Sequence, residues 1–384
     1  MLSNIRILDF SNYIPGPFAT LRLAELGAEV IKIESLSGDL ARSTEMIGDK
    51  EGPVFRAMNR NKKSIAVNLK TAEGKEIVQQ LIKKADVVVE SFRPGVMDKL
   101  GLGYEAAKEL KNDIVYCSIT GYGQEGELSK LGSHDLNFLS LSGVLSQMKN
   151  SHGEPIHPTI TFADYIGAFA ASERILAGII AKLQTGKGSY HSISVTDVMT
   201  SIMVNHAIVA EETGFQQGLS VLNGTMISYA IYPTKDKRFV GFGALEFKFW
   251  ENFCQAVYHP EWISAHGTEA NEGNPVYLEV KDLFLQKTLE EWAVFGREVD
   301  CCLTPILEIN ELKGYGNQNV YKAEWEDEQV KMHGDLKQKN QTPPPKLGEH
   351  SMDIVSKLLD KSEEQVKEWE KKGILKSEIS KLLK

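Results

Sequence analysis

Residues 5–34 read IRILDFSNYIPGPFATLRLAELGAEVIKIE, and this stretch decides the fold class. Its two ends, residues 5–9 and 29–34, are short and rich in Ile and Val, which predicts two strands. Between them, Pro15-Gly16-Pro17 stands where a helix can begin and predicts a helix over residues 18–26. Strand, helix and strand in this order predict a parallel sheet covered by helices.

The same alternation continues through the first third of the chain. We expect further strands at residues 64–69, 87–90 and 114–118, and an amphipathic helix at residues 72–84. The layout is typical of a Rossmann-like fold. However, the first turn, residues 11–17, lacks the three-glycine spacing that binds a pyrophosphate. The sequence therefore predicts an α/β fold and argues against ordinary dinucleotide binding.

The remainder of the chain predicts a second, smaller domain. A chain of 384 residues exceeds the usual size of a single core. After two long helices, at residues 164–183 and 197–212, the pattern changes near Gly218 to short strands and helices of α+β type. We expect a large domain from residues 1–217, a small inserted domain from residues 218–330, and a return to the large domain over residues 331–384.

Composition excludes several classes of function. The net charge of -9 argues against a nucleic-acid or membrane partner, because those partners attract a positive surface. The 4 cysteines form neither a disulfide framework nor a paired metal-ligand spacing, so we expect a cytoplasmic protein without a metal. The N-terminus has no signal-peptide pattern. The apolar residues 166–183 include Glu173 and Arg174, which indicates a buried helix rather than a membrane span.

Basic residues gather in the first domain and could bind phosphate groups, although the charges alone favour a solvated face. Three of them follow the ends of predicted strands, where open α/β sheets bind ligands. The cluster consists of Arg56, Arg60, Lys62 and Lys63, followed by Lys70, Arg93 and Lys99.

Asp164, His134 and Glu246 are candidate acid/base groups with simpler alternatives. Asp164 precedes a long predicted helix, so it can be an N-cap whose pKa the helix dipole lowers. His134 can be an ordinary loop histidine, and Glu246 a first-turn glutamate. The chain contains neither a Gly-x-Ser-x-Gly elbow nor a complete P-loop. Residue types alone leave these alternatives open.

Five segments resemble the family III CoA-transferase (CaiB/BaiF) superfamily, most closely its α-methylacyl-CoA racemase branch. They are SFRPGV (91–96), GYGQEG (121–126), SHDLNF (133–138), FADYIG (162–167) and GALE (243–246). The resemblance implies that Asp164 and His134 are catalytic and that Glu246 supports His134. It implies coenzyme A as part of the substrate and no prosthetic group. The implied coenzyme A contacts are Val67, Asn68, Leu69, Lys70, Ser91, Phe92, Arg93, Lys99, Leu100, Ser133, Asp135, Leu136, Asn137 and Phe138.

The resemblance also implies an interlocked homodimer with a Rossmann-like large domain in each subunit. Glu246 would then come from the partner subunit, and a monomer would be inactive. Ser35 stands where relatives often have an arginine near the adenine end of coenzyme A, so that contact is lost or falls to Arg42. Lys99 replaces a common arginine and would hold phosphate as a point charge.

The implied reaction is racemisation of a 2-methylacyl-CoA by proton transfer through an enolate. Asp164 and His134 would act on opposite faces of the α-carbon, with the helix N-terminus at Asp164 as oxyanion donor. The alternative is a CoA-transferase in which Asp164 forms an acyl anhydride. His134 with Glu246, Ser91 in place of a common asparagine, and the lack of consecutive glycines after Gly218 weigh against it. A third alternative is a CoA-binding protein without turnover.

Overall fold

The structure is a computed structural model that describes residues 1–46, 48, 50–150, 152–311, 323–326, 329–332 and 342–377. The chain divides into two compact units, one formed by Met1–Ile202 with Glu324–Lys384 and the other by Met203–Ala323. The first unit thus ends earlier than residue 217, where the sequence places the boundary.

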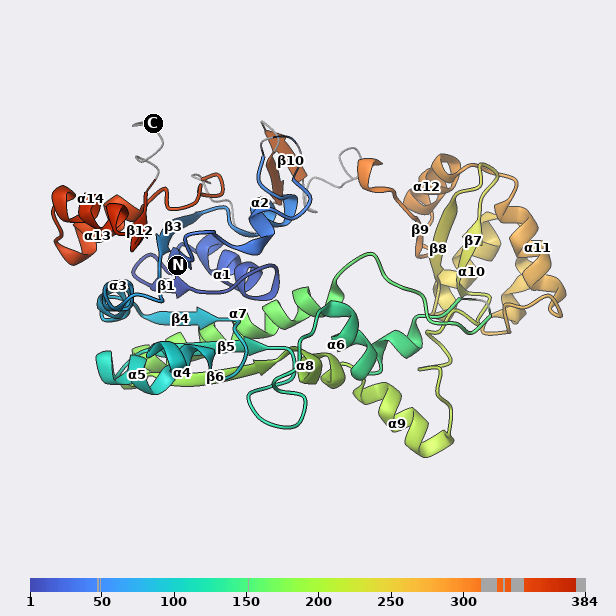
Figure 1. Cartoon of the computed structure of the whole chain (residues 1–384). Coiled ribbons are helices and arrows are strands. Elements are labelled where there is room, and N and C mark those ends of the chain that lie inside the picture. The colour runs from blue at the N-terminus through green and yellow to red at the C-terminus, as the bar shows by residue number, and fades with distance from the viewer. Residues whose placement is uncertain are drawn as a thin grey trace. The chain divides into compact units, whose positions relative to one another are not determined.

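A seven-stranded sheet forms the centre of the first unit (Figure 1). Its order is β12-β3-β2-β1-β4-β5-β6, and all neighbours are parallel except β12, which is antiparallel to β3. Without β12, the order β3-β2-β1-β4-β5-β6 is that of a doubly wound Rossmann sheet. The predicted α/β class with a parallel sheet is therefore confirmed. The strands are β1 (Arg6–Asp9), β2 (Glu29–Glu34), β3 (Lys62–Val67), β4 (Val87–Glu90), β5 (Val115–Thr120), β6 (Ser189–Ser194) and β12 (Leu375–Lys376).

Helices cover the sheet of the first unit. Helices α1 and α7 pack against each other and against strands, while α3, α5 and α13 share a core with Leu8, Ile31 and Val88. The helices are α1 (Pro15–Glu25), α2 (Pro53–Met58), α3 (Ala72–Ile82), α4 (Val96–Leu100), α5 (Tyr104–Leu110), α6 (Asp135–Leu141), α7 (Phe162–Thr185), α8 (Val195–Ser201), α13 (Ser351–Leu359) and α14 (Glu363–Lys371), with 3-10 helices η1 (Leu40–Arg42) and η2 (Val144–Gln147).

The C-terminal segment packs on the first unit. In Figure 1 the red helices α13 and α14 lie together; α13 packs against strand β3, and α14 against β12. The backbone N–H of Asn68 donates to the carbonyl oxygen of Ile374 at 2.8 Å. Ile354, Val355 and Leu375 join the same buried core as Val67. Residues far apart in the chain therefore complete one sheet.

The second unit is built on a three-stranded antiparallel sheet, β7-β8-β9, and an aromatic core that includes Trp250, Phe253, Phe284 and Trp292. This α+β character agrees with the sequence pattern. The elements are α9 (Val204–Thr213), β7 (Tyr229–Pro233), β8 (Phe239–Gly243), α10 (Phe247–Ala256), η3 (Pro260–Ala265), α11 (Pro275–Phe284), α12 (Leu289–Glu298), β9 (Leu303–Pro305) and η4 (Ile309–Glu311). A separate two-stranded sheet pairs β10 (Ala323–Glu326) with β11 (Gln329–Met332).

The prediction of one helix over residues 197–212 is wrong, because the chain forms α8 and then α9. Helix α8 buries Val195 and Met199, whereas α9 buries none of its residues. Helix α8 is therefore partly buried and α9 is not, and the chain turns between them at Ile202 and Met203.

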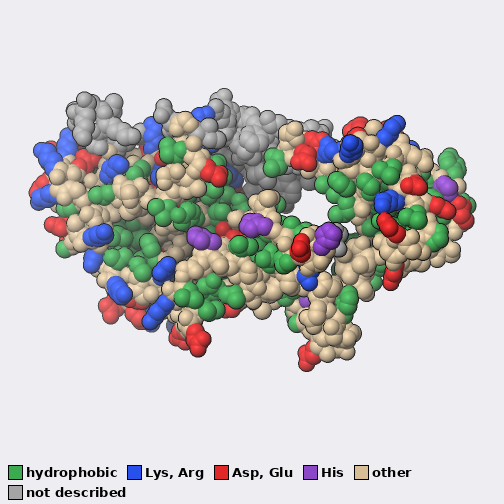
Figure 2. All heavy atoms as spheres, turned by 45° about the vertical axis from the view of Figure 1, so that its right-hand side comes forward, with side chains coloured by type: hydrophobic (Ala, Val, Ile, Leu, Met, Phe, Trp, Pro, Cys, Tyr) green, Lys and Arg blue, Asp and Glu red, His purple; other side chains and the backbone are tan. Residues whose placement is uncertain are grey.

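Both Lys or Arg and Asp or Glu side chains occur on the face shown in Figure 2. None of the helices in the described part of the chain combines the length and the apolar character needed to cross a membrane.

Candidate active site

A pocket of about 1150 Å³ opens in the first unit at the carboxyl ends of the parallel strands. This edge, and above all the point where strand order reverses between β1 and β4, is where open α/β sheets bind ligands. The lining segments that follow the strands include residues 12–15, 35–38, 67–70, 91–94 and 119–122.

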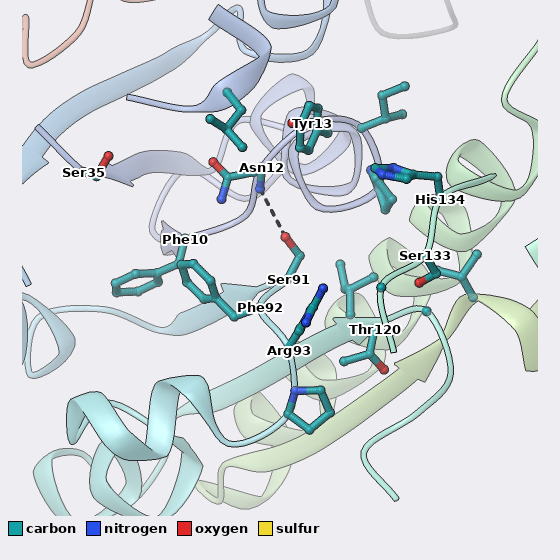
Figure 3. Close-up of a pocket in the computed structure, with 18 of the residues that line it drawn as sticks. Phe10, Asn12, Tyr13, Ser35, Ser91, Phe92, Arg93, Thr120, Ser133 and His134 are labelled. Carbon is teal, nitrogen blue, oxygen red and sulfur yellow. Dashed lines mark hydrogen bonds between the residues drawn. The ribbon is translucent and has the colours of Figure 1, made fainter. Parts of the chain in front are cut away.

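Figure 3 shows how the lining residues are spread across the pocket. Ser35 lies at one side of the view and His134 at the other, with Ser91 and Arg93 between them. The backbone N–H of Asn12 donates to Ser91 Oγ at 3.1 Å, which ties the loop after β1 to the loop after β4. The pocket is therefore an extended site that joins several loops.

Most of the coenzyme A contacts implied by the resemblance lie in this pocket. Three of them, Lys99, Leu136 and Asn137, are exposed and do not line it. The residues that line it are Val67, Asn68, Leu69, Lys70, Ser91, Phe92, Arg93, Leu100, Ser133, Asp135 and Phe138.

Only part of the basic cluster faces the pocket. Arg60 pairs with Glu25, Lys62 with buried Asp9, and Lys63 with Glu29. None of these three basic residues lines the pocket, so the suggestion that they hold a phosphate there is wrong. Lys70 and Arg93 line the pocket.

His134 and Asp164 lie in the same pocket, on two different helices. His134 is the N-cap residue of α6 and is exposed. Its backbone N–H donates to Asn137 Oδ1 at 3.0 Å, which fixes the start of the helix. Asp164 is half-buried in the first turn of α7, whose N-cap residue is Thr161. The N-cap alternative for Asp164 is therefore wrong.

The environment of Asp164 raises its pKa to about 7, because burial disfavours the carboxylate and the nearby Asp135 charge adds to the effect. The predicted lowering by the helix dipole is wrong, since desolvation outweighs it. A carboxyl group with this pKa exchanges protons readily near neutral pH, which suits acid/base chemistry.

The N-terminus of α7 does not offer free donors for an oxyanion. The backbone N–H groups of Ala163 and Asp164 donate to the Asp135 carboxylate, the latter at 3.0 Å. Those of Phe162 and Tyr165 donate to backbone carbonyl oxygens. The prediction of an oxyanion site at this helix start is therefore wrong, since its donors are already bonded.

Glu246 belongs to the second unit. It is the exposed N-cap residue of α10, and the negative charge of Glu246 helps raise the pKa of the Cys302 thiol, after burial. Within one chain the structure thus places Glu246 on a different unit from His134 and Asp164.

Buried charged side chains hold the loops around the pocket in place. Lys32 Nζ contacts Asp39 Oδ2 at 2.9 Å and donates to the carbonyl oxygen of Ser11 at 2.7 Å. Asp39 Oδ1 accepts the backbone N–H of Tyr13 at 3.3 Å. Tyr13 has a φ of 63°, which a bulky residue adopts only when its surroundings hold it there. These contacts link the loops that follow β1 and β2.

Arg42 is not available for the adenine end of a ligand. Its guanidinium binds both carboxylate oxygens of Glu34 at 2.7 Å and contacts Glu51 and the Phe55 ring. Arg42 is buried and does not line the pocket. The suggestion that Arg42 contacts the adenine end of coenzyme A in place of Ser35 is therefore wrong. Ser35 does line the pocket.

Sequence reasoning assigned no ligand contact to the loop after β1, to the end of β5 or to Tyr122, although the GYGQEG segment that contains Tyr122 was noted. Asn12, Tyr13, Thr120 and Tyr122 all line the pocket. Gly121 is needed there, because a Cβ at this position would overlap Ser133 and Phe138. Their position after predicted strands could have indicated that they line a ligand site.

No group of three or more His, Cys, Asp or Glu side chains in the described residues is arranged to hold a metal ion.

Comparisons with known proteins identify the family. The model of CoA-transferase family III matches residues 2–351. Mouse succinyl-CoA:glutarate CoA-transferase is 30% identical, over 99% of this chain and 91% of the relative. Mouse α-methylacyl-CoA racemase is 28% identical, over 92% of each protein. A CaiB/BaiF family protein from Brucella suis has a similar fold, with a TM-score of 0.78 at 23% identity over 93% of this chain and 99% of that chain. The chain belongs to CoA-transferase family III, a family of enzymes whose members matched here include both CoA-transferases and racemases.

Proposed function

We propose that this protein racemises the α-carbon of a 2-methylacyl-CoA thioester. The observation that carries the proposal is that His134 and Asp164, two proton-transfer groups of different type, line one pocket. The pKa of Asp164, raised to about 7 by burial and by Asp135, lets the carboxyl group both take and return a proton near neutral pH. The racemases among the relatives support this choice.

In the proposed reaction one of the two groups removes the α-proton, and the electron pair of the C–H bond passes into an enolate. The other group then delivers a proton to the opposite face, which inverts the centre. Because each turnover exchanges the protonation states of Asp164 and His134, the active pair carries one proton in total. The thioester remains intact throughout.

Coenzyme A would occupy the pocket along the carboxyl ends of the strands. Arg93 and Lys70 would bind its phosphates, since both line the pocket and carry positive charge. The Arg93 guanidinium lies against Gly132, where an added Cβ would come within 2.9 Å of it. Arg93 therefore lies beside the loop that carries His134. Glu246 of the partner subunit in a homodimer would support His134 by a hydrogen bond.

The test is the loss of optical purity of a single enantiomer of 2-methylacyl-CoA. We expect His134→Gln and Asp164→Asn each to slow racemisation by about 10²- to 10⁴-fold. His152→Gln is the matched control, because His152 is exposed and does not line the pocket. Racemisation that persists in Asp164→Asn would contradict the proposal.

CoA transfer between carboxylic acids is the second candidate, favoured by the transferases that match over almost the whole chain. Here the Asp164 carboxylate would attack the thioester carbonyl carbon, release CoA thiolate and form an acyl anhydride. An acceptor carboxylate would then displace the donor acid and form a second anhydride with Asp164, and CoA thiolate would attack the acceptor's acyl carbon, which forms the new thioester and releases the Asp164 carboxylate. Transfer of CoA to an added acid that needs Asp164 but not His134, without change at the α-carbon, would establish this reaction instead.

A further inference from the structure

Glu90 is a buried carboxyl group at the end of strand β4, where the chain reaches the pocket. It is 5% exposed and does not line the pocket, whereas the next four residues, 91–94, all line it. We call residues 91–94 the β4 loop. This loop contains Arg93, the proposed phosphate contact. Glu90 thus lies directly before a proposed ligand-binding loop without facing the ligand itself.

The Glu90 side chain links the β4 loop to the sheet. Its Oε2 atom accepts the backbone N–H of Phe92 at 2.8 Å. Ser118 lies opposite Glu90 on the neighbouring strand β5, and its hydroxyl also hydrogen-bonds to the Glu90 carboxyl group. A buried side chain therefore fixes the backbone of the β4 loop one residue before the proposed phosphate contact.

No basic side chain in the described part of the chain pairs with Glu90 or offsets its raised pKa. Burial is the main cause that raises the pKa of Glu90 to about 7, and the like charge of Asp98 adds to it, while the two hydrogen bonds oppose it. The other titratable groups that Glu90 influences are Tyr116, Cys117 and Tyr190, whose pKa values it raises. Burial of an acid without a cationic partner disfavours folding. The bond to the β4 loop therefore explains this acid better than a gain in overall stability does.

We propose that Glu90 is a positioning residue that fixes the β4 loop and thereby places Arg93 at the phosphates of coenzyme A. The inference rests on the proposed coenzyme A site and applies to racemisation and to CoA transfer alike. Charge-assisted hydrogen bonds to phosphate depend on the geometry of the guanidinium, and this geometry depends on the backbone that carries it. Phe92 also lines the pocket, so the same bond holds an apolar wall of the site.

Two substitutions of similar size separate the hydrogen-bond acceptor from the charge. Glu90→Gln keeps an oxygen for the Phe92 N–H and offers an amide N–H to Ser118 Oγ, whereas Glu90→Met fills the same space without an oxygen. Asp86→Ala is the matched control at the other end of the same strand. Asp86 directly precedes β4, accepts the backbone N–H of Arg6 at 3.0 Å and does not line the pocket.

Binding of coenzyme A itself is measured by calorimetry, so that the result does not depend on turnover. We expect Glu90→Met to raise Kd by about 3- to 30-fold, less than the loss of Arg93 itself, because a displaced guanidinium keeps part of its bond to phosphate. Glu90→Gln and Asp86→Ala should change Kd little. With a 2-methylacyl-CoA as substrate, Glu90→Met should raise KM in the same proportion and leave kcat almost unchanged, because the catalytic groups are untouched.

A double-substitution cycle tests whether Glu90 acts through Arg93. In the Arg93→Ala background, Glu90→Met should have a much smaller effect on Kd than in the wild type, since the group that it positions is absent. Hydrogen exchange at the Phe92 amide should become faster in Glu90→Met but not in Glu90→Gln or in the control, because only Glu90→Met removes the acceptor.

A Kd in Glu90→Met equal to that of the wild type would overturn the inference, and so would additive effects of Glu90→Met and Arg93→Ala on binding. Rapid exchange of the Phe92 amide in the wild-type protein would overturn it whether or not the variants fold. A wild-type protein that binds coenzyme A but performs neither reaction would instead remove the proposed function, and the Kd values would still decide the role of Glu90.

Discussion

At the residue scale, Asp164 is distinguished by a carboxyl group that titrates near neutral pH. Burial and the Asp135 charge raise its pKa to about 7. Only the ionised form can accept a proton, so the pocket contains a base that becomes active as the pH rises through about 7.

The variant His134→Gln should isolate the titration of Asp164. We expect its α-proton exchange to be slow below pH of about 7, to rise as the carboxylate forms, and to level off above that value. The measurement is the exchange rate in buffered deuterium oxide as a function of pH. Glu90, whose pKa burial also raises to about 7, does not line the pocket. A transition that disappears in His134→Gln/Glu90→Gln would assign the titration to Glu90 and contradict the prediction.

Arg93 and Lys99 offer a matched test of the proposed phosphate contacts. Arg93 lines the pocket and Lys99 does not. Loss of a hydrogen bond to a charged group costs about 1.5–3 kcal/mol, so Arg93→Ala should raise KM for an acyl-CoA by about 10- to 100-fold. Lys99→Ala should change KM little. If both substitutions changed KM equally, Arg93 would not be the phosphate contact that we propose.

At the element scale, buried ion pairs hold the strand ends on which the pocket is built. Lys62 Nζ contacts Asp9 Oδ2 at 3.0 Å and donates to Asn59 Oδ1 and to the carbonyl oxygen of Pro17. Asp9 in turn accepts from Ser11 and Thr20. Strands β1 and β3 and the start of α1 are therefore linked by charged groups that water does not reach.

Lys62→Met should lower the free energy of unfolding by about 3–5 kcal/mol, because it leaves the Asp9 charge buried without its partner. The neighbouring Lys63→Met is the control. Its side chain is 47% exposed and pairs with Glu29, so its loss should cost at most about 1 kcal/mol. Urea unfolding measures both changes. Similar values for the two variants would show that the buried pair does not stabilise the strands as described.

Regular elements were predictable where apolar residues repeat clearly. Strands β1, β2 and β4 and helix α3 lie close to their predicted ranges. Strand β6 was not predictable, because its sequence SYHSIS is polar and the strand lies at the edge of the sheet. The antiparallel strand β12 has only two residues and depends on pairing with β3.

At the scale of the whole molecule, the shared pocket of His134 and Asp164 required the fold as well as the motifs. Motif resemblance indicated both residues, but only the meeting of α6 and α7 shows that they line one pocket. The raised pKa of Asp164 was not predictable, since it depends on burial and on Asp135, 29 residues earlier in the chain. The pairing of Lys62 with Asp9 was not predictable either, because only the fold brings these two distant residues together.

Glu246 motivates a prediction about assembly. If a homodimer completes each site with Glu246 of the partner subunit, Asp164→Asn and Glu246→Gln should complement each other. Each variant alone should be slow, whereas co-expression of differently tagged subunits should restore racemisation in the purified heterodimer, because one of its sites is intact. A heterodimer as slow as both parents, with stable subunit pairing, would show that Glu246 acts within its own chain or not at all.

The most direct test of the central claim is proton NMR of a 2-methylacyl-CoA incubated with the wild-type protein in deuterium oxide. Abstraction of the α-proton by a group that exchanges with solvent predicts that the α-proton signal disappears and that both enantiomers form, with the thioester intact. Retention of the α-proton while CoA passes to an added carboxylic acid would contradict racemisation and establish the transferase reaction instead.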